Sequence, residues 1–245
     1  MRNTLNKILR NFGFELERYG TSTSNHKLQK QLVLSHDIDL LIDIGANTGQ
    51  FGEKMREIGY IGKIISFEPM RKPFEILKAK ASKDANWEAH NCALGEEEKE
   101  SQINISENSY SSSLFNAKKE LTDSVPATKV IAKETIKIKK LTDVVPIDNL
   151  KAFKNVMLKI DVQGYEFYVL NGCAPLLPHI KIIQCEMSFS VLYENGKLYD
   201  ELIAYMKGIN FSLYSLIPEF YDEATGKLME ADGIFINNAL SSNPR

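Results

Sequence analysis

The chain has 245 residues, of which 43% are hydrophobic, 25% charged and 9% aromatic, and this is enough to form one domain with a sizeable core. Thirty Lys and Arg residues stand against 32 Asp and Glu residues, and the net charge of −2 gives no general attraction to nucleic acid or to an anionic membrane. No apolar run is long enough to cross a membrane, and the start of the chain lacks the features of a secretory signal. We therefore expect a cytoplasmic protein that binds no nucleic acid.

The first 30 residues are predicted to form a helical extension, followed by one main domain over residues 31–245. Leu5, Ile8, Leu9 and Phe12 recur at helical spacing, with basic residues among them. Such an amphipathic helix would either dock on the domain or make a weak peripheral contact with a membrane or a partner. We favour docking because the excess of basic residues is small. Nothing in the sequence indicates the oligomeric state.

Four short apolar segments predict the strands of a mostly parallel sheet: residues 38–44, 63–68, 156–161 and 181–186. Each is almost continuously apolar, as strands covered by helices on both faces must be. Segments of helical character, 50–58 and 164–172, follow the first and third of these strands. The predicted fold class is therefore α/β, a doubly wound and mostly parallel sheet of the Rossmann-like type.

The segment Asp43-Ile-Gly-Ala-Asn-Thr-Gly49 follows the first predicted strand and opens the first helix, where open α/β sheets bind nucleotides. It lacks the Lys-Ser/Thr pair of a P-loop, and its glycines are not spaced as in the dinucleotide fingerprint G-x-G-x-x-G. Because Asp43 would repel a phosphate and attract an ammonium, the loop suits a ligand with a positively charged end. S-adenosylmethionine is such a ligand, since it carries an ammonium and a sulfonium but no phosphate.

Glu68 ends the second predicted strand and supports the same ligand. A carboxylate there can accept hydrogen bonds from both hydroxyls of a ribose. Dehydrogenases use a carboxylate in the same way, so Glu68 alone does not separate S-adenosylmethionine from a nicotinamide dinucleotide. Asn91 and Ala93 follow the next apolar stretch and are expected to flank the adenine.

Residues 101–140 predict an antiparallel hairpin region inserted between the two halves of the sheet. Segments 102–105 and 130–139 alternate polar and apolar residues, as half-solvated strands do. Between them lies a loop rich in hydroxyl groups, with Tyr110, Ser111, Ser112 and Ser113. These four residues are candidates for binding a polyol substrate or closing over it, and a plain surface loop is the alternative.

Asp161 and Glu186 end the two later strands of the predicted sheet. Adjacent parallel strands lie about 4.8 Å apart, so the two carboxylates are expected to share one proton or one metal ion, with Mg²⁺ as the candidate metal. Our hypothesis is that Asp161 acts as a base or metal ligand near the methyl group of the bound S-adenosylmethionine, with Glu186 as second ligand or orienting partner. The structural alternative is that Asp161 caps the helix that follows and that Glu166 braces its first turn.

Several stretches resemble the FkbM-type S-adenosylmethionine-dependent methyltransferases, within the class I Rossmann-like methyltransferase fold. The segment Lys159-Ile-Asp-Val-Gln-Gly-Tyr-Glu166 is the most specific of them, whereas many methyltransferases share the glycine loop. In chain order, the matching stretches are Leu41–Gly49, Ser66–Pro69, Asn91–Gly95, Ser111–Leu114, Leu158–Glu166, Val169–Gly172 and Gln184–Glu186.

The resemblance implies methylation of a hydroxyl oxygen, often on a sugar, a glycan or a secondary-metabolite precursor. An alcohol must lose its proton during such a transfer, which requires a base or a metal. The predicted cofactor site consists of the following residues: Asp43, Gly45, Ala46, Asn47, Gly49, Glu68, Pro69, Asn91, Ala93 and Asp161. The alternatives are a nicotinamide-dependent oxidoreductase and a non-catalytic binding module with a vestigial cofactor pocket.

Overall fold

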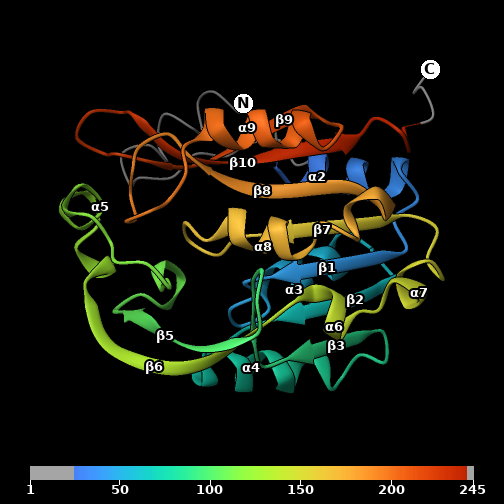
Figure 1. Cartoon of the computed structure of the whole chain (residues 1–245), viewed down its shortest axis with the longest axis horizontal. Coiled ribbons are helices and arrows are strands. Elements are labelled where there is room, and N and C mark those ends of the chain that lie inside the picture. Colours follow the sequence, from blue (N-terminus) through green and yellow to red (C-terminus); the bar gives the residue numbers. More distant parts are fainter. Residues whose placement is uncertain (1–24, 242–245) are drawn as a thin grey trace, which may run out of the picture.

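A computed structural model describes residues 25–241, so the helix predicted near the start of the chain lies outside the described residues. One seven-stranded sheet forms the centre, in the order β3-β2-β1-β7-β8-β10-β9 (Figure 1). Its strands are β1 (Leu40–Ile44), β2 (Lys63–Phe67), β3 (Trp87–His90), β7 (Val156–Ile160), β8 (Ile180–Ser188), β9 (Phe211–Tyr221) and β10 (Leu228–Asn237).

The first five strands of the sheet order run parallel, whereas β10 runs antiparallel to both β8 and β9. The mostly parallel sheet predicted from the sequence is therefore confirmed. The chain moves outward from β1 through β2 to β3 and then returns to place β7 on the other side of β1. The strand order thus reverses between β1 and β7, and the loops that follow these two strands diverge to leave a crevice.

The central strands form because almost every side chain in them is apolar and buried. All five residues of β1 and all five of β7 are buried. The one polar side chain in each strand is charged, and the two are neighbours, since Asp43 pairs in register with Lys159. The sheet therefore contains a buried charged pair next to the carboxyl ends of its central strands.

Helices cover both faces of the sheet. Val169, Leu202 and Leu141 pack on one face, and Leu32 and Met55 pack on the other. The first face is covered by α6 (Leu141–Val144), α7 (Ile147–Leu150), α8 (Glu166–Gly172) and α9 (Tyr199–Gly208), and the second by α2 (Asn25–Ser35), α3 (Gln50–Glu57) and α4 (Arg71–Ala81). Helix α2 runs across residue 30, where the sequence placed the start of the main domain.

The inserted hairpin region predicted over residues 101–140 is confirmed as a separate three-stranded sheet of order β4-β6-β5. It consists of β4 (Ala93–Leu94), β5 (Lys99–Ser106) and β6 (Val130–Lys139), and β5 and β6 pair antiparallel. Ile103 and Ile138 pack against Met70, which follows β2. The short helix α5 (Lys119–Ser124) and the 3₁₀ turns at Ser109–Ser111 and Pro126–Thr128 lie between β5 and β6, and a third 3₁₀ turn precedes β8 at Leu177–His179. The insertion therefore lies beside the carboxyl ends of the central strands (Figure 1).

The last two strands were not predicted as strands from the sequence. They form an antiparallel pair, and β10 also pairs with β8, so that Asp232 lies opposite Glu186. Two acidic residues of β10, Glu230 and Asp232, are consequently brought beside the strand end where Glu186 was expected. Across residues 25–241, we find no helix that is long and apolar enough to span a membrane.

Candidate active site

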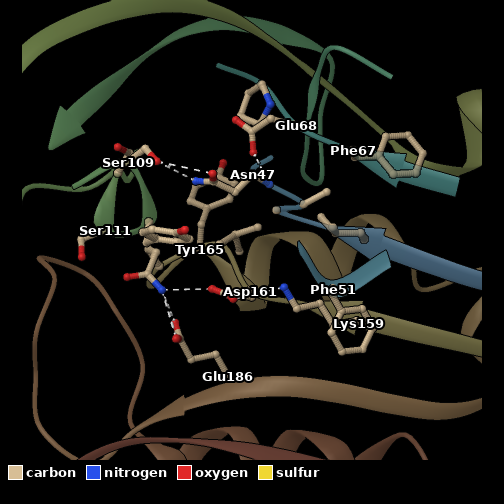
Figure 2. Close-up of a pocket in the computed structure, with 18 of the residues that line it drawn as sticks. Asn47, Phe51, Phe67, Glu68, Ser109, Ser111, Lys159, Asp161, Tyr165 and Glu186 are labelled. Carbon is tan, nitrogen blue, oxygen red and sulfur yellow. Dashed lines mark hydrogen bonds and ion pairs between the residues drawn. The ribbon is translucent and has the colours of Figure 1, made fainter. Parts of the chain in front are cut away.

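A cavity of about 500 Å³ lies at the carboxyl ends of the central strands. Glu68 and Asn47 lie at one end of it, Glu186 lies at the other, and Asp161 lies between them (Figure 2). Of the residues predicted as site residues, those that line the cavity are Gly45, Ala46, Asn47, Glu68, Pro69, Ala93, Tyr110, Ser111, Ser112, Asp161 and Glu186. The predicted residues that line the cavity thus come from six separate segments of the chain.

The loop after β1 is held close to the end of β2. The backbone N–H groups of Gly45 and Ala46 both donate to the carbonyl oxygen of Phe67, at 3.0 and 2.9 Å. Gly45 has a φ of 80° and Asn47 a φ of 46°, so both adopt the left-handed conformation that turns the loop sharply. The turn directs the backbone N–H of Asn47 at Glu68.

Glu68 is fixed by the backbone through both of its carboxylate oxygens. Oε2 accepts from the N–H of Asn47 at 2.9 Å, and Oε1 accepts from the N–H of Met70 at 2.8 Å. Each oxygen keeps a further lone pair, which suits it to accept from a ribose hydroxyl. Burial raises the pKa of Glu68 to about 7, against the opposing effect of the two backbone hydrogen bonds.

The wall beside Glu68 is apolar. Phe67, Met70, Cys92, Leu94 and Ile103 line this part of the cavity, which suits the faces of a purine. We call this region, with Gly45, Ala46, Asn47, Glu68 and Ala93, the cofactor half. Among the described residues that line the whole cavity, only Lys54 and Lys159 carry a positive charge. The residues present therefore fit an adenosine that carries no phosphate.

Four predicted site residues do not line the cavity. Asp43 is fully buried below the loop, and Gly49 lies against the side chains of Leu77 and Trp87. The side chain of Asn91 donates to the carbonyl oxygens of Glu68 and Pro69, both at 2.9 Å. The fourth, Ser113, donates from its hydroxyl to the carbonyl oxygen of Gln163 at 2.6 Å. The contacts of these four residues support the loops around the cavity.

A row of polar side chains crosses the middle of the cavity (Figure 2). Lys159 Nζ lies 3.7 Å from Asp43 Oδ1 and 3.1 Å from Asp161 Oδ2. The other oxygen of Asp161 accepts from the amide nitrogen of Gln163 at 3.0 Å, and this nitrogen also lies 3.0 and 2.9 Å from the two oxygens of Glu186. Sequence reasoning missed Lys159 and Gln163 as site residues, although both lie within the stretch that resembles the family.

The structure brings Asp161 and Glu186 together as expected, but the amide of Gln163 bridges them where a shared metal ion or proton was predicted. Gln163 has a φ of 55°, which is rare for a residue with a side chain, and its amide oxygen accepts from the hydroxyl of Tyr193 at 2.6 Å. Within residues 25–241 there is no group of three or more His, Cys, Asp and Glu side chains that could hold a metal ion.

Asp161 does not cap α8, because its two oxygens are bound to Lys159 and Gln163 and the helix begins only at Glu166. Glu166 itself braces the turn, since it accepts from the backbone N–H groups of Val162 and Gly164 at 3.2 and 3.1 Å. The alternative interpretation of Glu166 as a structural residue agrees with these contacts.

Burial and neighbouring charges shift the pKa values of the polar side chains in this row. Burial would lower the pKa of Lys159, but the carboxylates of Asp161, Asp43 and Asp232 outweigh this effect and raise it, so Lys159 stays charged. Burial raises the pKa of Glu186 well above its usual range, and the neighbouring acids Glu230 and Asp161 add to the shift. Asp161 has a side chain that is 36% exposed and faces the cavity, which makes it the carboxylate most accessible to a ligand in this row.

The serine-rich loop closes one side of the cavity. Ser109 Oγ lies 3.2 Å from the amide nitrogen of Asn47, and Tyr110 accepts from the amide of Gln50 at 2.9 Å. Ser111 and Ser112 also line the cavity. The loop of the insertion is thus joined by hydrogen bonds to the loop and helix that follow β1.

Comparison with known protein families finds one match. The chain matches the model of the methyltransferase FkbM domain over residues 43–213. Among proteins with curated functions, none matches it in sequence.

Solved structures with a similar chain trace have low sequence identity to this chain. A protein of Pyrococcus horikoshii described as a candidate RNA methyltransferase is 11% identical, with a TM-score of 0.46, over 91% of this chain and 88% of its own. A TehB-like SAM-dependent methyltransferase of Corynebacterium glutamicum is 10% identical, with a TM-score of 0.43, over 97% and 98%. The precorrin-6y C5,15-methyltransferase of Geobacter metallireducens is 10% identical, with a TM-score of 0.43, over 90% and 92%. We draw no functional conclusion from these three.

The match to the FkbM domain covers most of the chain, and it includes the loop after β1, Glu68, the polar row and Glu186. It favours methyl transfer over the nicotinamide-dependent alternative. The chain therefore belongs to the FkbM family of S-adenosylmethionine-dependent methyltransferases.

Proposed function

We propose that the chain transfers a methyl group from S-adenosylmethionine to the oxygen of a hydroxyl, on a sugar, a glycan or a secondary-metabolite precursor. The observation that carries this proposal is the position of Asp161. Its partly exposed carboxylate lies in the same cavity as the cofactor half and beside the hydroxyl-rich loop. An alcohol acceptor needs a proton acceptor at such a position.

When bound, S-adenosylmethionine would supply the methyl group of its sulfonium to the acceptor oxygen by in-line displacement, and S-adenosylhomocysteine would remain. In the proposed reaction, the residues of the chain hold the cofactor and the acceptor in line and exclude water. Glu68 accepts from the ribose hydroxyls, and the apolar wall with Phe67 and Met70 encloses the adenine. Asp161 accepts the proton of the hydroxyl, while Lys159 and Gln163 hold its carboxylate in place.

A transfer assay with a matched variant tests the proposal. The protein is incubated with labelled S-adenosylmethionine and a panel of nucleotide-sugars, glycans and small phenols, and products are scored by mass for the gain of one methyl group. Asp161→Asn should lower the rate by about 10²- to 10⁴-fold, the usual contribution of general base catalysis, and change the affinity for S-adenosylhomocysteine by less than about tenfold. Asp148→Asn, which removes a carboxylate whose side chain is 91% exposed on α7, is the control and should keep the full rate.

The same assay separates the alternatives. Because the Gln163 amide bridges Asp161 and Glu186, we expect the rate to be unchanged by EDTA. If EDTA abolishes the activity, this would instead support the hypothesis that Asp161 and Glu186 hold a metal ion. An Asp161→Asn variant with unchanged turnover would remove Asp161 as base, and binding of S-adenosylhomocysteine without transfer to any acceptor would favour the non-catalytic module.

A further inference from the structure

The end of the cavity beyond Gln163 is built from acids and amides. Gln184 and Glu186 lie on β8, Glu230 and Asp232 lie on β10, and Glu219 lies at the exposed mouth on β9; all five line the cavity. We call these five residues the acidic half. The antiparallel register pairs Asp232 with Glu186, which gathers acids from separate strands at one place.

Several buried oxygens here have no hydrogen-bond partner within the described part of the chain. They are Oε1 of Gln184, Oε1 of Glu230 and, across the cavity on α2, Oε1 of Gln29. Glu230 is only 8% exposed and Gln184 only 1%. All three side chains line the same cavity, and an unpaired buried polar atom costs about 1–3 kcal/mol. A ligand that supplies donors would remove this cost.

The acidic half itself contains no positively charged residue, although Lys54 and Lys159 line the same cavity and the charge of Lys54 opposes the rise in the pKa of Glu219. Lys159 is already bound to Asp161 and lies near Asp43, so it is engaged on the other side of Gln163. Burial, together with the neighbouring acids, raises the pKa of Glu230 to about 8 and that of Asp232 to about 6. A cation bound between these acids would lower both pKa values again.

We propose that the acidic half binds a protonated amine on the methyl acceptor, close to the hydroxyl that is methylated. An ammonium supplies three N–H donors and one positive charge, whereas a hydroxyl supplies one donor and no charge. The inference rests on the proposed function, since it assigns the acceptor's place in the same cavity. Asp161 lies between Glu68 and Glu186, so Glu186 of the acidic half is separate from the surface around Glu68 (Figure 2).

Three probes that differ in one group test the inference by binding. Methyl glucosaminide carries the amine, methyl glucoside carries a hydroxyl in its place, and the N-acetyl derivative carries a neutral amide. Their dissociation constants are measured by ligand-observed NMR on the full chain, with and without saturating S-adenosylhomocysteine. We expect the glucosaminide to bind about tenfold more tightly than either neutral probe, the difference given by one charge-assisted hydrogen bond.

Variants of the acids test whether the acidic half is responsible for the preference for the amine probe. Glu230→Gln and, at the exposed mouth, Glu219→Gln should each reduce the preference for the amine by several-fold and leave the binding of methyl glucoside unchanged. Glu223→Gln makes the same substitution at an exposed position in the β9–β10 turn, outside the cavity, and should keep the full preference. Because Glu219 is exposed, its variant should fold even if the change at Glu230 does not.

Four results would overturn the inference: equal binding of the amine and neutral probes, an unchanged preference in both variants, displacement of the amine by S-adenosylhomocysteine, and displacement of the amine by Mg²⁺ at millimolar concentration. Displacement by S-adenosylhomocysteine would indicate that these acids bind the cofactor. Displacement by Mg²⁺ would indicate that they bind a metal ion. Methyl transfer to neutral sugars with no amine preference contradicts this inference alone. An amine preference in binding without any transfer contradicts the proposed function alone.

Discussion

The carboxylate of Glu68 is buried, so its protonation state is coupled to ligand binding. Its pKa is raised to about 7 by burial. A ribose donates hydrogen bonds to the carboxylate, so the ligand prefers the deprotonated form and lowers this pKa. We therefore expect the affinity for S-adenosylhomocysteine to rise as the pH increases from 6 to 8, with release of a proton.

Calorimetric titration at several pH values, in two buffers of different ionisation enthalpy, measures both the affinity and the proton release. Glu68→Gln is the control: it should bind more weakly at every pH and show no such dependence. If the affinity of the wild-type chain does not change between pH 6 and 8, Glu68 does not accept hydrogen bonds from the ribose.

Lys159 is the second residue whose charge matters, since it lies between Asp43 and Asp161 and is almost fully buried. Lys159→Met removes the cation and leaves two carboxylates close together. Breaking a buried ion pair in this way costs about 3–5 kcal/mol, so we expect a loss of that size in the free energy of unfolding, measured with urea. Lys154→Met, at an exposed position, should change it by less than about 0.5 kcal/mol. A small effect at both positions would mean that Lys159 is not needed to hold the row together.

The sequence indicated the acids of the site but not their partners. Asp43, Glu68, Asp161 and Glu186 could be predicted because each lies at or near the carboxyl end of an apolar segment, and these ends meet at one edge of a parallel sheet. Lys159 lies inside a strand, where a single charge indicates nothing until its neighbour in register is known. The bridging role of Gln163 depends on a left-handed backbone conformation that residue types alone do not indicate.

The loop between β1 and α3 is packed against the loop that follows β7. A Cβ atom on Gly45 would overlap the backbone carbonyl of Asp161, and φ is 80° at this residue. Gly45→Ala should therefore cost more than the about 1–2 kcal/mol of a left-handed residue with a side chain, because the backbone of Asp161 must also move.

Gly59→Ala is the matched control for this substitution, since Gly59 has a φ of 94° and no atom lies within 4 Å of a Cβ built there. Urea unfolding of both variants isolates the cost of the contact between the two loops, and Gly45→Ala should also weaken the binding of S-adenosylhomocysteine. Equal losses of stability in both variants would argue against a close contact between these loops.

The central strands and the inserted hairpin could be predicted from the sequence, and the last two strands could not. The central strands are short apolar runs, and the alternation in β5 and β6 indicated the inserted hairpin. The residues of β9, Phe-Ser-Leu-Tyr-Ser-Leu-Ile-Pro-Glu-Phe-Tyr, show no regular alternation, because this edge strand is largely exposed and pairs with β10 across register shifts. Missing β9 and β10 also meant missing Glu230 and Asp232, which reach the cavity only through this pairing.

Across the whole molecule, the buried acids should make stability depend on pH. The pKa of Glu230 is raised to about 8 by burial and by Asp161, Glu166 and Asp232, and that of Glu166 is raised to about 7 by burial. An acid with a raised pKa binds more protons in the folded than in the unfolded state. The free energy of unfolding should therefore fall as the pH rises from about 4.5 to about 8.

Glu230→Gln removes one of these acids without changing its shape. We expect this variant to be more stable than the wild-type chain at pH 9, by several kcal/mol at most, and equally stable at pH 4, as measured by urea unfolding. The exposed variant Glu223→Gln should follow the wild-type chain at both pH values. A Glu230→Gln variant that is less stable at pH 9 would show that this carboxylate is stabilised in the free protein.

We propose that one cavity holds S-adenosylmethionine between Glu68 and Asp161. Calorimetric titration of the full chain with S-adenosylhomocysteine, and separately with NADH, tests it most directly. We predict binding of one S-adenosylhomocysteine per chain, weakened at least about tenfold by Glu68→Gln, and no binding of NADH. Absence of S-adenosylhomocysteine binding, or binding that Glu68→Gln leaves unchanged, would contradict this account of the cavity.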